Sequence, residues 1–116
     1  MAYEKDIKDW TKQFAIHITK FSIELRRYGV EYALRDQLLR SGTSVGSNVK
    51  EAKASSSRRE LIRYYEIALR SGDETEYWLE VVKRAYELNN EQFEILNSEL
   101  KQIMNVIARI IINLKN

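Results

Sequence analysis

The chain has 116 residues with no cysteine, no proline and only four glycines, which excludes disulfides, thiolate nucleophiles and cysteine metal sites. So few turn-forming residues argue against a fold of many short strands and favour long helices. The formal net charge is only +2, but the charges are unevenly distributed along the chain.

Four stretches show the apolar spacing of amphipathic helices, one apolar side chain every three or four residues. These stretches cover residues 4–27, 31–54, 58–88 and 91–115. In the first, the apolar positions extend from Ile7 to Tyr28. Gly29 then supplies the left-handed residue that commonly ends a helix.

The second stretch contains a run of small residues from Ser41 to Ser47, which is a poor helix former by itself. A loop at this point would divide the stretch into two short helices. The apolar spacing continues through the run without a shift of phase, so we predict one continuous helix. Small side chains at these positions would let another backbone approach closely.

The third stretch opens with Ser57-Arg58-Arg59-Glu60, the pattern of a capping box in which Ser57 and Glu60 each satisfy a free backbone N–H. Asn89-Asn90 predicts a turn and a cap for the fourth stretch. The segment 110–112 has high strand propensity by itself. Because the surrounding pattern is helical, we predict a helix there as well.

Helices joined by a few residues pack antiparallel to their neighbours, so the sequence predicts an all-α, up-down-up-down four-helix bundle in a single domain, residues 1–116. The spacing predicts shallow, left-handed packing like that of coiled coils. No segment approaches the length of a membrane span, and the charged N-terminus has no apolar run of signal-peptide length. We therefore expect a cytoplasmic protein that does not enter a membrane.

The third and fourth stretches carry more apolar side chains than one core-facing stripe requires. Surplus apolar surface usually marks a partner surface, so we predict a homo-oligomer. The alternative is a wide stripe in the core of a monomer. The predicted oligomer interface consists of Tyr64, Ile67, Trp78, Val81, Ile111 and Ile112.

Several polar side chains lie in or beside the predicted seams and need hydrogen-bond partners. They either fix helix register, as a buried asparagine does in coiled coils, or form an anion or metal site. We favour the structural role. The structural polar residues are Asn48, Glu51, Ser57, Glu60, Ser71 and Glu74.

No pattern typical of catalysis, a metal or a cofactor is present. The one histidine, His17, has no carboxylate three or four residues away and is interpreted as an ordinary flanking residue. Glycine-rich phosphate loops are absent. We therefore expect no catalytic residues, no cofactor and no metal site, and no enzyme.

The charges divide the chain into a basic and an acidic part. Residues 26–70 contain ten basic and five acidic residues, whereas residues 71–99 contain two basic and eight acidic residues. Such polarity reflects either pairing of unlike charges between neighbouring helices or subunits, or an anionic partner for the basic part.

Basic residues concentrate around the turn expected between the second and third helices, with Tyr64 and Tyr65 nearby. Basic groups interleaved with aromatic rings can hold a nucleic-acid backbone and stack its bases. The candidate nucleic-acid-binding residues are Arg40, Lys50, Lys53, Arg58, Arg59 and Arg63.

Two segments carry a family resemblance. Residues 40–52 read RSGTSVGSNVKEA, and residues 57–74 read SRRELIRYYEIALRSGDE. They resemble the second and third helices of bacterial four-helix bundle proteins first noticed as products of intervening sequences in large-subunit ribosomal RNA genes. Gly46 stands where the family usually has proline. The positions that match are Ser44, Val45, Asn48, Glu51, Ala52, Ser57, Glu60, Leu61, Tyr64, Ile67, Ala68, Ser71 and Glu74.

The resemblance implies the same bundle and a ring-like homo-oligomer, a pentamer. The related accessory variability proteins of diversity-generating retroelements are strongly basic and work by binding nucleic acid and a reverse transcriptase. We therefore hypothesise a non-enzymatic homo-oligomer that binds RNA or another nucleic acid through its basic end. A second hypothesis is a protein-interaction scaffold whose acidic residues, 71–99, recruit a basic partner.

Overall fold

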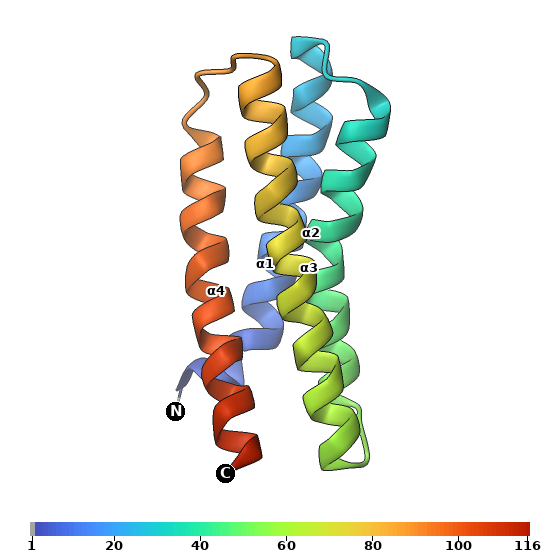
Figure 1. Cartoon of the computed structure of the whole chain (residues 1–116), viewed down its shortest axis with the longest axis vertical. Coiled ribbons are helices and arrows are strands. Elements are labelled where there is room, and N and C mark those ends of the chain that lie inside the picture. The colour runs from blue at the N-terminus through green and yellow to red at the C-terminus, as the bar shows by residue number, and fades with distance from the viewer. Residues whose placement is uncertain (1) are drawn as a thin grey trace.

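The computed structural model describes residues 2–116 and, within them, the side chains of residues 7–116. Four long helices lie side by side in alternating directions, and the described residues contain no strand (Figure 1). The helices are α1 (Ala2–Glu24), α2 (Tyr32–Lys53), α3 (Arg58–Ala85) and α4 (Gln92–Lys115), with a 3-10 helix, η1 (Leu25–Tyr28), extending α1. The predicted all-α, up-down-up-down four-helix bundle is confirmed.

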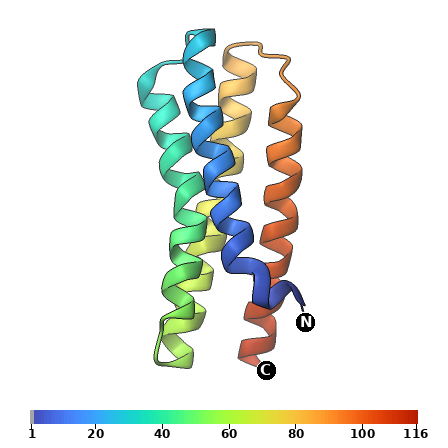
Figure 2. The same ribbon diagram turned by 180° about the vertical axis from the view of Figure 1, so that it is seen from behind.

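The bundle is a rod of 45 × 22 × 19 Å. Seen from behind, α1 lies between α2 and α4, so each helix contacts two neighbours (Figure 2). The α1–α2 and α3–α4 connections lie at one end of the rod, and the α2–α3 turn lies at the other (Figure 1). None of the described helices combines the length and the apolarity that a membrane span needs.

Two helices end in the same hydrogen-bonding pattern. After η1, the predicted left-handed Gly29 has φ +75°, and the Val30 N–H donates to the Leu25 carbonyl. After α3, Glu87 has φ +51°, and the Leu88 N–H donates to the Lys83 carbonyl at 3.0 Å. α3 therefore ends at Ala85, three residues before the predicted end at 88, because a non-glycine residue adopts the left-handed conformation there.

The small-residue run forms continuous helix within α2, as predicted. It allows α1 to approach closely. A Cβ atom added to Gly42 would lie 2.6 Å from the Ile18 side chain, and one added to Gly46 would lie 3.0 Å from the Thr11 carbonyl oxygen. On the other side of the bundle, Gly72 of α3 makes room for Met104 of α4.

The core contains the predicted apolar seams of the four helices except Tyr28, which is exposed. It also contains two threonines whose hydroxyls donate to carbonyls of their own helix, Thr11 to Ile7 and Thr75 to Ser71. One predicted interface residue also belongs to this core. Ile111 is only 7% exposed in a single chain, because the buried face of α4 is wide enough to include both Ile110 and its successor. The prediction that Ile111 contacts another copy is therefore wrong.

Candidate nucleic-acid interface

The basic residues near the α2–α3 turn gather at one end of the bundle, at the bottom of Figure 1. Lys50 and Lys53 lie in the last turn of α2, and Arg58 and Arg59 open α3. The turn is held by Ser57, whose hydroxyl accepts the Glu60 N–H at 3.1 Å. The fold thus brings together charges that the sequence separates by a stretch of small polar residues.

These cations are exposed, and the fold does not neutralise most of them. Within the described part of the chain, Lys50, Arg58, Arg59 and Arg63 take part in no ion pair. The N-terminus of α3 adds the partial positive charge of its free N–H groups beside Arg58 and Arg59. Cations at a helix N-terminus are repelled by the positive end of the helix dipole, so a bound anion would stabilise this end of the bundle.

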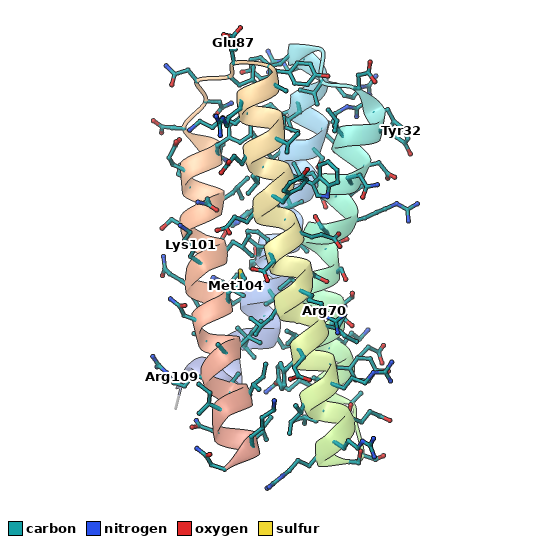
Figure 3. The ribbon with its side chains drawn as sticks, viewed as in Figure 1. Tyr32, Arg70, Glu87, Lys101, Met104 and Arg109 are labelled. Carbon is teal, nitrogen blue, oxygen red and sulfur yellow. The ribbon has the colours of Figure 1, made fainter. Side chains whose placement is uncertain are left out.

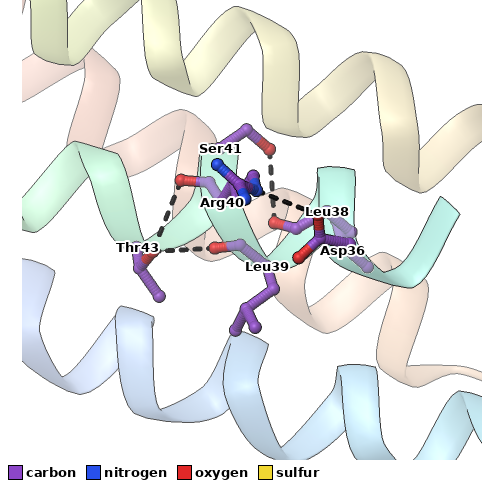
Figure 4. A network of polar contacts seen from close by, with 6 residues as sticks. All are labelled: Asp36, Leu38, Leu39, Arg40, Ser41 and Thr43. Atoms are coloured by element: carbon purple, nitrogen blue, oxygen red, sulfur yellow. Dashed lines mark hydrogen bonds and ion pairs between the residues drawn. The ribbon is translucent and has the colours of Figure 1, made fainter. Parts of the chain in front are cut away.

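Arg40 does not join this cluster. It lies ten residues before Lys50 on α2, which is about 15 Å along the helix axis. Its guanidinium Nε donates to Asp36 Oδ2 at 2.9 Å, so its charge is already paired (Figure 4). In the same turns the Ser41 and Thr43 hydroxyls donate to carbonyls of α2. The hydroxyl groups of the small-residue run thus find hydrogen-bond partners within their own helix.

The tyrosines expected beside the cluster are not available as stacking platforms. Tyr65 is 2% exposed and lies in the core, and Tyr64 is partly buried against the core. Adjacent positions on an amphipathic helix point to different faces, and here one ring is buried and the other is only partly exposed. The α2–α3 end therefore offers positive charge without an exposed aromatic ring.

The polar residues of the seams meet at the contact of α2 with α3. The Asn48 side-chain amide donates to the Ser44 carbonyl at 2.8 Å and to the Ser44 hydroxyl at 2.9 Å. The Ser71 hydroxyl donates to the Ser44 hydroxyl at 2.9 Å and so links the two helices. This arrangement fixes their register, whereas Glu51 and Glu74 are exposed and take no part in it.

His17 has a carboxylate partner that its own helix could not reveal. Its Nδ1 lies 3.1 Å from Glu99 Oε1 of α4, and Trp10 Nε1 donates to the other oxygen of Glu99 at 3.3 Å. Glu99 thereby joins α4 to two positions of α1 that are about two turns apart. Among the described residues, no group of three or more histidine, cysteine, aspartate and glutamate side chains is placed to hold a metal ion.

Four acidic residues line an open groove of about 980 Å³ between the upper halves of α3 and α4: Asp73, Glu76, Glu80 and Glu94. Two of its acids are paired: Lys83 Nζ lies 2.6 Å from Glu94 Oε1, and Arg84 lies 3.4 Å from Glu80. Lys83 also lowers the pKa of Glu94, first by this hydrogen bond and then by its charge. Figure 3 shows Met104 between the two helices and Lys101 on α4.

The predicted interface residues other than Ile111 keep part of their apolar surface. Tyr64, Ile67, Trp78 and Val81 of α3 are partly buried, and Ile112 of α4 is 59% exposed. Tyr77, beside Trp78, is also largely exposed, and their rings meet edge to face at 5.0 Å. The strip therefore remains accessible to a partner in a single chain.

Comparison with known proteins gives a family and a fold. The family model described as "23S rRNA-intervening sequence protein" matches residues 4–109. The chain belongs to this family. A crystal structure of a protein of unknown function from the S23 ribosomal protein family of Bacteroides thetaiotaomicron is 37% identical, with a TM-score of 0.85. The alignment covers 90% of this chain and 97% of that chain.

The family resemblance predicted from the sequence is thus confirmed. A search of curated proteins found no match. In this chain the family-matching residues Ser44 and Ser71 link α2 to α3, and Asn48 donates to Ser44. Gly46, at the family's usual proline position, continues the helix and contacts α1. These residues therefore hold α2 against α1 and α3 in the middle of the bundle.

Proposed function

We propose that this protein is a non-enzymatic, cytoplasmic homo-oligomer that binds RNA or another nucleic acid through the α2–α3 end of its bundle. The observation that carries the proposal is the group of exposed cations, Lys50, Arg58, Arg59 and Arg63, with no ion-pair partner in the described chain. The family's name refers to intervening sequences of 23S rRNA, so RNA is the nucleic acid to test first.

Cations of this kind bind phosphates and release the counterions that the nucleic acid had condensed. Among the described residues this end has no largely exposed ring, so its contacts are to the nucleic-acid backbone. Binding through it is therefore independent of sequence and falls steeply with salt. For a single strand, each phosphate contact contributes about 0.7 to the slope of log affinity against log salt.

The test is fluorescence anisotropy with labelled RNA from about 50 to about 200 mM salt. Alanine at Lys50, Arg58, Arg59 and Arg63 should lower the slope by about 3 and the affinity by about 10²-fold near 0.1 M salt. The matched control removes four exposed cations elsewhere and should change binding little. Equal losses in both variants, or no RNA binding at low salt, would contradict the proposal. The control residues are Lys12, Arg40, Arg84 and Lys101.

Self-association would repeat the basic end around a ring and increase its avidity for a long nucleic acid. The apolar strip of Tyr64, Ile67, Trp78, Val81 and Ile112 supports it, and the family resemblance favours a pentamer. Sedimentation at micromolar concentration should show an oligomer. Ile112→Glu, a change at an exposed position, should dissociate it without loss of helix content by circular dichroism. A wild-type monomer would remove this part of the proposal.

A second candidate function is a protein-interaction scaffold. The observation that favours it is the α3–α4 groove, in which Asp73 and Glu76 have no ion-pair partner among the described residues. A basic segment of another protein would neutralise them. Capture of one specific protein that survives nuclease treatment, and is lost with Asp73→Lys and Glu76→Lys, would favour the scaffold over nucleic-acid binding.

A further inference from the structure

The α1–α2 turn, at the opposite end of the rod from the basic cluster, exposes two aromatic rings. Tyr28 is 46% exposed and Tyr32 is 69% exposed. Neither ring contributes to the core, although tyrosine usually buries its ring and leaves its hydroxyl in water. Ile23, one turn earlier on α1, is also 61% exposed. Exposed apolar groups gathered at one place indicate a contact surface.

The backbone that carries these rings is held firmly. Gly29, with φ +75°, and the hydrogen bonds from Gly29 to Arg26 and from Val30 to Leu25 close the turn. Val30 is 3% exposed and anchors the turn to the core. The Tyr86 hydroxyl of α3 accepts the Glu31 N–H at 3.1 Å. Rings on such a scaffold lose little conformational entropy when they bind a ligand.

Arg35 orders the second ring. Its guanidinium lies 5.6 Å from the centre of the Tyr32 ring, and its Nε donates to the Val30 carbonyl at 3.1 Å. The cation thus supports Tyr32, most of which is still open to solvent. Figure 3 shows Tyr32 at the side of the bundle and Glu87 at its tip, so the acidic α3–α4 connection does not cover the ring.

The surroundings of the rings are basic. Residues 20–35 contain four cations and two acids, a net charge of +2. None of the four cations has an ion-pair partner in the described part of the chain. Beside the turn, a shallow hollow of about 560 Å³ is lined by Lys20, Ile23, Glu24, Arg26 and Arg27. Unpaired cations next to exposed rings are the two elements with which proteins hold single strands.

We propose that the α1–α2 turn is a second nucleic-acid site, specific for single strands. Unpaired bases stack on Tyr28 and Tyr32, while Lys20, Arg26 and Arg27 hold the adjacent phosphates. A duplex keeps its bases stacked inside the helix and cannot use the rings. The site shares its class of ligand with the proposed function but not its residues, because the two ends of the 45 Å rod are separate surfaces.

The test uses a labelled, unstructured RNA of about eight nucleotides and a duplex of the same length. Tyr28→Ala with Tyr32→Ala should lower single-strand affinity about tenfold or more for each ring, leaving duplex affinity unchanged. The slope of affinity against salt should remain, because no cation is lost. Tyr28→Phe with Tyr32→Phe keeps the rings and should bind like the wild type. Both positions are exposed, so circular dichroism should show folded variants.

The variant at Lys50, Arg58, Arg59 and Arg63 separates this site from the α2–α3 end. If that variant binds the single strand normally and the alanine pair does not, the second site stands and the proposed function fails. Wild-type affinity in the alanine pair, or equal losses in the phenylalanine pair, would overturn the second site. So would tyrosine-dependent binding to phosphatidylserine vesicles with no such dependence for RNA, since the surface would then bind lipid.

Discussion

The α2–α3 end and the α1–α2 turn both present cations at an end of the same rod, but they differ in what accompanies the charge. At the α2–α3 end Tyr65 is buried and Tyr64 is partly buried, so the exposed cations Lys50, Arg58, Arg59 and Arg63 have no largely exposed ring beside them among the described residues. At the α1–α2 turn the cations lie beside two exposed rings. Charge density at an end of the bundle thus depends on composition, whereas the capacity to stack bases depends on which face of a helix an aromatic ring occupies.

The largest effect is expected from altering both ends together. On an RNA long enough to span the rod, the alanine changes at Lys50, Arg58, Arg59 and Arg63 combined with Tyr28→Ala and Tyr32→Ala should lower affinity by the product of the separate losses. Sites this far apart act additively, within about 0.5 kcal/mol. Anisotropy titration measures it. A combined loss of affinity no larger than either separate loss would show that the two ends act as one site, and the contrast between them would not hold.

The contact between α1 and α2 depends on the small residues of α2. Gly42→Ala should destabilise the fold by about 1–2 kcal/mol, because the added methyl group meets Ile18 at 2.6 Å. This cost exceeds the gain in helix propensity, which is about 1 kcal/mol. Urea unfolding measures the change. The control is Ser47→Ala, exposed on the same helix, which should be neutral or stabilising; a stabilised Gly42→Ala would contradict the close α1–α2 contact.

The two turns are closed by different devices, and each should contribute about 1 kcal/mol. Gly29→Ala places a side chain at φ +75° and should cost about 1–2 kcal/mol, although a Cβ has open space there. Ser57→Ala removes the hydroxyl that accepts the Glu60 N–H and should cost about 1 kcal/mol. Thermal or urea unfolding compares them. An unchanged free energy of unfolding for Gly29→Ala would show that the turn is not constrained as described.

The smallest effect concerns Glu94, near the α3–α4 connection. Lys83 lowers the pKa of this carboxyl below its ordinary value of 4.5, so the pair stabilises the folded chain at neutral pH. This contribution is lost as the pH falls through the lowered pKa. Lys83→Ala should return the pKa of Glu94 towards 4.5, which a nuclear magnetic resonance titration of the carboxyl would detect. An unchanged titration would show that the ion pair does not persist in solution.

Much of the fold follows from apolar spacing, because burial imposes a period of three to four residues on each helix. The spacing also identified α2 as continuous through its glycines. The spacing did not predict the early end of α3, because Glu87 adopts a left-handed conformation without being a glycine, the residue that usually indicates such a helix end. It also assigned Ile111 to an interface, because the width of a buried face depends on the neighbouring helices.

The candidate sites were predicted less evenly. Clustering of basic residues identified the α2–α3 end, because charge can be counted along the chain. It could not show that Arg40 is paired with Asp36, that Tyr65 is buried, or that His17 meets Glu99 of another helix. Tyr28 continues the apolar spacing of the first helix, which predicts a core position, and only its exposure in the fold shows otherwise.

The central claim is that RNA meets the ends of this bundle and not its acidic side. Amide chemical-shift mapping during titration with RNA tests it most directly. The amide signals of residues 50–63 and 26–35 should shift, and those of residues 73–101, which include the α3–α4 groove, should stay unchanged. Shifts confined to the groove, or none at saturating RNA and low salt, would contradict it.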